Sequence, residues 1–194
     1  MATEYATLPE LKAFRRKSGD TDDGLYQPRL IAASRAIDRK TGRRFYLDET
    51  ATARTFNPRG RTTPDGLLLV DDIGSAAGLV VEVGTGSSWT AVTNYEPSPD
   101  NALAQNEPIT GLLRATPFWG YAPDRVRITA QWGWPTVPDD IKEATLLLAN
   151  RLLLRKDSPE GVAASGEWGA LRLSRWDPDV EALVSPFIQP GFAG

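Results

Sequence analysis

A run of four apolar residues in the predicted helix "DDIKEATLLLANRLLL" constrains the fold of this chain most strongly. Successive side chains of an α-helix point about 100° apart, so residues Leu146 to Ala149 face four directions. A helix on the surface of its own domain needs only one apolar stripe. The sequence therefore predicts a helix from Pro138 or Asp139 to Asp157 that is covered on more than one side, by its own chain or by another.

The chain contains neither cysteine nor histidine among its 194 residues. These absences remove disulfides, thiolate nucleophiles, imidazole bases, Ser–His triads and the common zinc sites. Any catalysis would have to use carboxylates, lysine or tyrosine. These absences count against catalysis without excluding carboxylate chemistry, and we expect a protein that is not an enzyme, with no catalytic residues, no metal and no cofactor.

Two pairs of adjacent carboxylates are the remaining candidates for catalysis. Asp71 and Asp72 lie in a predicted strand, where neighbouring side chains point to opposite faces and cannot easily share one ion. Asp139 and Asp140 suit the positive end of the predicted helix. A carboxylate-dependent hydrolase stays an alternative, but no convergent site supports it.

Helical and strand-like patterns alternate in blocks along the chain. Thr7 and Glu10 have the spacing of a capping box before a short helix, and a second helix is predicted to start between Asp23 and Tyr26 and to end at Gly42. From Arg44 to Trp132, short runs rich in β-branched and aromatic residues, among them "GLLLVDDI" and "GLVVEV", are separated by Gly, Pro, Asn and Asp. They predict about five strands, with "GTGSS" as a hairpin turn. The segment 96–123 is predicted as a long ordered loop that can contribute an edge strand. "DPDVEALVSPF" predicts a last short helix capped by Asp177.

These blocks predict an α+β fold: a small helical bundle of about four helices with an inserted antiparallel β-domain and an extended C-terminal segment. The expected divisions are residues 1–43 with 124–160 for the helical core, 44–123 for the β-rich insert and 161–194 for a C-terminal docking segment. No apolar run approaches the length of a membrane span, and no secretory signal is recognisable. We expect a soluble protein made and kept in the cytoplasm.

Charge is divided unevenly along the chain. Residues 1–61 hold 13 basic against 8 acidic side chains, net +5, whereas the rest is net −8. The basic density supports three interpretations, namely a solvated helix end with salt bridges, contact with DNA, or docking against an acidic partner. The predicted basic patch consists of Arg35, Arg39, Arg43 and Arg44.

Six tryptophans are many for this length, and two of them bracket "WGALRLSRW" near the C-terminus. Trp and Arg anchor protein interfaces, but tryptophan also fills cores. Both interpretations stay open for these residues.

The succession of motifs resembles the head-to-tail connector, or adaptor, proteins of long-tailed bacteriophages. The resemblance rests on "LIAASRAIDRKTGRRFY", on "VRITAQWGWPTVPDDIKEATLLLANRLLLRKDSPEG" and on "WGALRLSRWDPDVEALVSPF", with a longer β-rich insert between the first two. It implies a structural virion protein without catalytic activity, in a ring of about twelve copies at the head–tail junction. The implied partners are further copies of itself, the portal protein, a tail-completion or stopper protein and DNA passing through the channel, with no membrane and with assembly in the host cytoplasm.

The resemblance also implies roles for particular residues. The long helix has an apolar girdle, formed by Leu146 to Ala149 and Leu152 to Leu154, which would be buried between subunits. The C-terminal segment would dock on the portal or on a neighbour. The expected subunit interface comprises Leu146, Leu147, Leu148, Leu152 and Leu153. The expected docking residues are Trp168, Leu171, Arg172, Leu173, Arg175 and Trp176. The alternative function is a nucleic-acid-binding module that uses the basic region Arg35–Arg61.

Overall fold

The computed structural model describes residues 4–114, 116, 119–120, 124–155, 162–163, 171–172 and 177–189. These residues form two compact units, which we call the helical unit (within 1–43 and 137–189) and the sheet unit (within 44–136). Helices and an antiparallel sheet are thus combined in one chain, which confirms the predicted α+β class.

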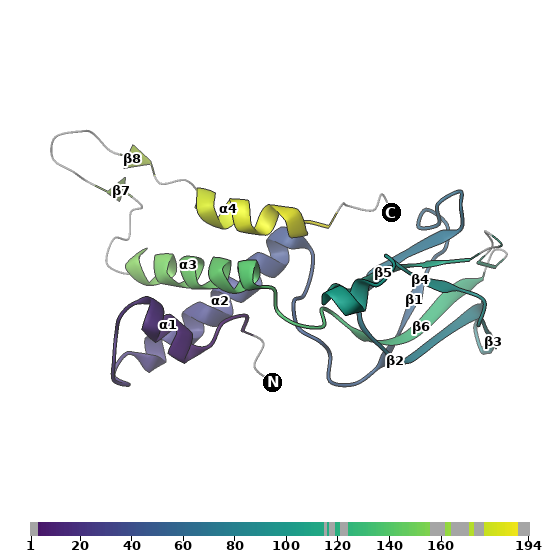
Figure 1. Cartoon of the computed structure of the whole chain (residues 1–194), viewed down its shortest axis with the longest axis horizontal. Helices are drawn as coiled ribbons and strands as arrows, with labels where there is room; N and C mark the ends of the chain where they lie inside the picture. Colours follow the sequence, from purple (N-terminus) through teal and green to yellow (C-terminus); the bar gives the residue numbers. More distant parts are fainter. Residues whose placement is uncertain are drawn as a thin grey trace. The chain divides into compact units, whose positions relative to one another are not determined.

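The helical unit is built around the long helix predicted from the sequence. Figure 1 shows α1 and α4 on opposite sides of α3. The four α-helices are α1 (Leu8–Phe14), α2 (Asp23–Thr41), α3 (Asp139–Leu154) and α4 (Pro178–Val184). The core that α1, α2 and α3 share includes the buried residues Leu11, Tyr26, Leu30, Ala33, Leu146, Ala149 and Leu153.

Local sequence explains where these helices begin and end. The capping box predicted for α1 is present: the Thr7 hydroxyl accepts a hydrogen bond from the Glu10 backbone N–H at 3.4 Å, and the Glu10 carboxylate accepts one from the Thr7 N–H at 2.6 Å. Gly42 ends α2 with φ 72°, a left-handed conformation that glycine adopts without steric cost. Asp177 caps α4 by accepting from the Asp179 N–H at 3.1 Å.

The sheet unit contains one antiparallel sheet in the order β1-β6-β2-β5-β4, with β3 paired to β2. All of its strand pairs are antiparallel. The strands are β1 (Thr52–Phe56), β2 (Leu67–Thr85), β3 (Ser88–Ala91), β4 (Glu96–Ser98), β5 (Ile109–Leu113) and β6 (Arg125–Trp132), and a short 3-10 helix, η1 (Ala102–Gln105), precedes β5.

Strand β2 differs from the prediction, which divided it into two strands. Its first half, from Leu67 to Ile73, pairs with β5, and its second half pairs with β6 as far as Gly84. The register shifts between Ser75 and Val80, where Gly78 has φ 71°. The glycines that separate the two predicted strands therefore lie at an irregularity inside one long strand. The "GTGSS" turn is confirmed, because Thr85 pairs with Ser88.

The predicted loop at 96–123 contributes more than an edge strand. It forms the edge strand β4, then η1, and then β5, which lies between β4 and β2. Strand β5 is buried at Ile109, Gly111 and Leu112, so this segment forms part of the core of the sheet unit.

Strand β6 shows the alternation that half-buried strands need. Val126, Ile128, Ala130 and Trp132 are buried, while the residues between them are more exposed. The predicted helical core of residues 1–43 and 124–160 includes β6, whereas β6 pairs with β1 and β2 inside the sheet unit. The division of the chain therefore falls after β6. None of the described helices is long and apolar enough to cross a membrane.

Candidate assembly surfaces

The apolar girdle of α3 is covered largely by its own chain. Leu146 and Leu153 are each only 7% exposed and belong to the core of the helical unit. Leu147, Leu148 and Leu152 are half-buried, and Leu148 and Leu152 pack against the same core. The apolar side chain that this helix leaves most open is Leu154, which is 57% exposed.

Polar contacts fix the helices that cover α3. On the α1 side, the Arg15 guanidinium donates to the Asn150 side chain at 3.1 Å, and Lys142 lies 3.7 Å from the Glu10 carboxylate. On the α4 side, the Arg151 guanidinium lies 3.4 Å from the Asp177 carboxylate. Four consecutive apolar residues can be accommodated within one chain because α1, α2 and α4 each cover a part of the circumference of α3.

The predicted basic patch is divided between the two units. Arg35 lies 3.1 Å from the Asp38 carboxylate on α2, and Arg43, half-buried, follows that helix. Arg44 belongs to the sheet unit, where it lies 3.4 Å from Asp48 and its guanidinium lies over the ring of Tyr46. Arg39 is exposed and forms no ion pair within the described residues. The ion pairs favour the interpretation as a solvated helix end over that of a phosphate-binding track.

The C-terminal segment returns to the helical unit. Two short strands, β7 (Val162–Ala163) and β8 (Leu171–Arg172), pair antiparallel, with Val162 opposite Arg172. Helix α4 then packs on α3 through the fully buried Val180 and Val184, and Glu181 lies 2.7 Å from Lys40 of α2. The predicted docking segment 161–194 includes α4, whereas this helix is packed into the helical unit. The predicted docking residues Trp168, Leu173, Arg175 and Trp176 lie outside the described residues.

The described tryptophans have mainly structural roles. Trp132 is fully buried and donates its indole N–H to the Thr52 carbonyl at 2.8 Å. Trp134 is 8% exposed and donates to the Asp72 carboxylate at 3.1 Å. Both therefore belong to the core of the sheet unit, where each buried indole N–H has a partner.

The outer face of the sheet carries a charged and aromatic cluster that the sequence analysis missed. Arg127 makes two hydrogen bonds to the Glu82 carboxylate, at 2.7 and 2.8 Å, and its guanidinium lies 4.3 Å from the centre of the Trp89 ring. The paired guanidinium lowers the pKa of Glu82. The register places these residues side by side, because Glu82 is opposite Arg127 and Gly84 is opposite Trp89. Only knowledge of the strand register would have revealed this cluster.

The adjacent carboxylates Asp71 and Asp72 do not converge. Asp71 faces Arg54 at 2.9 Å and Arg61 at 3.7 Å, whereas Asp72 is buried and accepts from Trp134. This difference follows from the alternation of side chains along β2. Among the described residues no group of three or more carboxylates could hold a metal ion.

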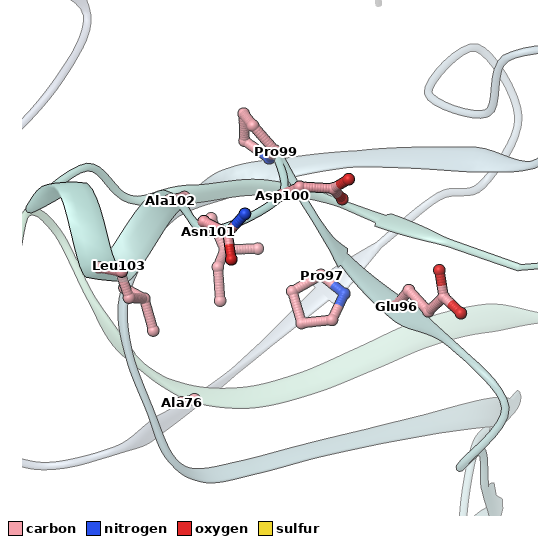
Figure 2. A pocket seen from close by; sticks show the side chains of 10 residues that line it. Ala76, Glu96, Pro97, Pro99, Asp100, Asn101, Ala102 and Leu103 are labelled. Carbon is pink, nitrogen blue, oxygen red and sulfur yellow. The ribbon is translucent and has the colours of Figure 1, made fainter.

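The sheet unit has a pocket of about 420 Å³ beside η1. Figure 2 shows Pro97, Pro99, Ala76 and Leu103 around it, with the carboxylates of Glu96 and Asp100 directed away from its centre. Its lining contains no basic side chain. The pocket therefore offers an apolar concavity with two rim carboxylates, and no pairing of a nucleophile with a base.

Three solved structures share the fold over nearly the whole chain. A chain in the neck of an empty gene transfer agent particle, computed with C6 symmetry, aligns with a TM-score of 0.58 and 17% identity, covering 100% of this chain and 96% of that one. A chain in the neck of the native particle, computed with C12 symmetry, aligns with a TM-score of 0.55 and 18% identity, again at 100% and 96% coverage. A chain in the virion of the native gene transfer agent particle aligns with a TM-score of 0.51 and 21% identity, over 98% and 97%.

No family profile matches the sequence, and no curated protein does. The likeness therefore concerns the fold, and it extends over both units. The chain has the fold of proteins found in the neck and virion of a gene transfer agent particle.

Proposed function

We propose that this chain is a structural virion protein of the head–tail junction, where it forms a ring between portal and tail that extends the DNA channel. The observation that carries the proposal is the shared fold: both units align, over almost the full length of each chain, with neck proteins of a phage-like assembly. The resemblance of the sequence to head-to-tail connectors points the same way. Function by assembly needs surfaces and no catalytic group.

A ring is supported by the symmetry of the related assemblies, which were computed with six-fold and twelve-fold symmetry. In a ring each subunit uses two different surfaces, one toward each neighbour. We propose about twelve copies, with the portal protein on one side and a tail-completion or stopper protein on the other. DNA would pass through without lasting contact, since each phosphate bound to Lys or Arg adds to affinity.

The segment between α3 and α4 is the proposed docking element for the portal or a neighbouring subunit. Its two ends are held by the helical unit, since α3 precedes it and α4 packs back on α3. The strand pair β7–β8 lies within this span, and Trp168 and Trp176 flank β8 in the sequence. Aromatic and arginine side chains are the usual anchors of protein interfaces.

This docking role is tested by changing the segment without removing α4. Replacing 158–176 by a Gly/Ser linker of equal length should abolish sedimentation with purified portal rings, while the far-UV circular dichroism of the helices is unchanged. The double substitution Trp168→Ala and Trp176→Ala should weaken docking as well. The control Trp89→Ala removes an indole from the outer sheet face and should not. Undiminished docking of the linker variant would exclude the segment as the docking element.

The position in the particle is tested by deleting the gene. Particles assembled without this chain should package DNA into heads that carry no tails, because the connection between portal and tail is missing. Supplying the chain in trans should restore tailed particles. Normal tailed particles from the deletion would contradict a role at the head–tail junction.

A further inference from the structure

Helix α2 has a second apolar stripe, on the side opposite its buried face. The buried face is formed by Tyr26, Leu30, Ala33 and Ile37. At 100° per residue, Leu25, Pro28, Ala32 and Arg39 lie roughly 110–170° around the helix from the centre of that face. All four are exposed, Leu25 by 42%, and Ile31 beside them is 40% exposed. This outer stripe is apolar in its first half and basic in its second.

Helix α3 has an outer stripe with the reverse order. Asp140 and Glu143, near the start of the helix, are exposed and form no ion pair within the described part of the chain. Leu147 is half-buried and Leu154 is 57% exposed. The contacts of Asn150 with α1 and of Arg151 with α4 bound this stripe on its two sides. It is acidic in its first half and apolar in its second.

The two stripes match in length, charge and polarity when the helices run antiparallel. Leu25 and Arg39 are 14 residues apart, as are Asp140 and Leu154, so each pair spans about 21 Å of helix. We propose that the outer stripe of α2 in one subunit docks on the outer stripe of α3 in the next subunit, in antiparallel register. The opposed pairs are Leu25 with Leu154, Ala32 with Leu147, and Arg39 with Asp140.

This contact fits a closed ring. The two stripes are different surfaces of one subunit, so the contact is heterologous and can be repeated around a ring. It places apolar side chains against apolar ones and opposite charges against each other at one end, which fixes the register. It also relocates the interface expected on α3: Leu146 and Leu153 belong to the subunit's own core, and Leu147 and Leu154 face the neighbour. The inference rests on the proposed ring and specifies which surfaces close it.

Cross-linking between two single-cysteine chains tests the register, and the chain offers a clean background because it has no cysteine of its own. Chains carrying Arg39→Cys and chains carrying Asp140→Cys are mixed, assembled on purified portal rings and treated with a short bismaleimide. A covalent dimer of the two differently tagged chains is expected. The matched control pairs Arg39→Cys with Leu154→Cys, which the register separates by about 21 Å. It should give no dimer.

Charge reversal tests the same contact without a reagent. Arg39→Glu and Asp140→Arg should each weaken subunit association at least about fivefold, because each places like charges together. The two changes combined in one chain should restore association. Arg59→Glu, at an exposed position of the sheet unit, is the control and should have no effect.

The outcomes separate this contact from the ring itself. Rings that form normally but give the dimer only in the control pair, or in neither pair, overturn the α2–α3 contact and leave the ring intact. A chain that stays monomeric with portal rings present overturns the ring, and the contact with it. Cross-linking of the predicted pair alone, together with rescue by the double charge reversal, establishes the contact.

Discussion

Two neighbouring leucines at the end of α3 distinguish a helix covered by its own chain from one covered by another subunit. Leu153 is 7% exposed and lies in the core of the helical unit, whereas Leu154 is 57% exposed. Truncation of each to alanine removes the same atoms from the same turn of helix. Any difference in the free energy of unfolding therefore reports the surroundings of the two side chains.

The expected magnitudes differ clearly. Leu153→Ala removes a side chain from a packed core, which costs roughly 2–5 kcal/mol, and we expect about 3 kcal/mol. Leu154→Ala loses less than half of a burial worth about 1.5–3 kcal/mol, without leaving a cavity. The higher helix propensity of alanine offsets part of that loss, so we expect less than about 1 kcal/mol. The two variants should differ by about 2 kcal/mol, roughly a thirtyfold difference in the unfolding equilibrium.

Urea unfolding followed by far-UV circular dichroism measures this difference, because all four described α-helices lie in the helical unit. Leu154→Ala should instead reduce ring formation with the portal, since that side chain is proposed to face the neighbour. Equal losses for the two variants, or an unchanged unfolding free energy for Leu153→Ala, would refute the conclusion that α1, α2 and α4 cover the girdle. Intact rings with Leu154→Ala would argue against the α3 stripe.

Three further predictions follow from local geometry. Gly133→Ala should destabilise the sheet unit by about 2–5 kcal/mol, because Gly133 has φ 107° and an added Cβ would meet the Tyr46 carbonyl. The fluorescence of Trp132 and Trp134, which flank Gly133 in the sequence, measures this loss during urea unfolding. Thr7→Ala should cost about 1 kcal/mol of helical-unit stability in urea unfolding, since it removes the cap of α1; an unchanged midpoint would show that the capping box is dispensable. Hydrogen bonds from the Thr7 backbone and hydroxyl, with Lys142 nearby, lower the pKa of Glu10 from its usual 4.5. The ionised Glu10 carboxylate therefore stabilises the fold fully above pH 4.5, and this stabilisation is lost as the pH falls through the lowered pKa. The stability of the wild type should therefore fall more than that of Glu10→Gln between about pH 6 and pH 3, and equal slopes would contradict this linkage.

Local signals in the sequence predicted the helices of this fold well. The capping box at Thr7 and the stop at Gly42 depend on residues a few positions apart, so they can be recognised without a structure. The long helix was expected to begin at Pro138 or Asp139 and to end by Asp157, and it spans Asp139–Leu154. Local capping, glycine conformation and acidic first turns are sufficient for such predictions.

Tertiary contacts determined what the sequence could not supply. The "GSAAG" stretch separates two short strand-like runs in the sequence, but pairing with β5 and β6 on either side carries β2 through it as one irregular strand. The burial of Val180 and Val184 shows that α4 packs on α3 of its own chain, whereas an amphipathic seven-residue helix can equally cover a neighbour. The outer stripe of α2 was missed because the stripe through Leu30 and Ile37 already explained that helix.

The central proposal, a ring of this chain on a portal, is tested most directly by its mass in solution. Light scattering of the purified chain, alone and mixed with purified portal rings, measures how many copies associate. A ring of about twelve copies in either sample is the expected result, and the cross-linking described above then tests whether the α2 and α3 stripes close it. A monomer in both samples would contradict the connector function.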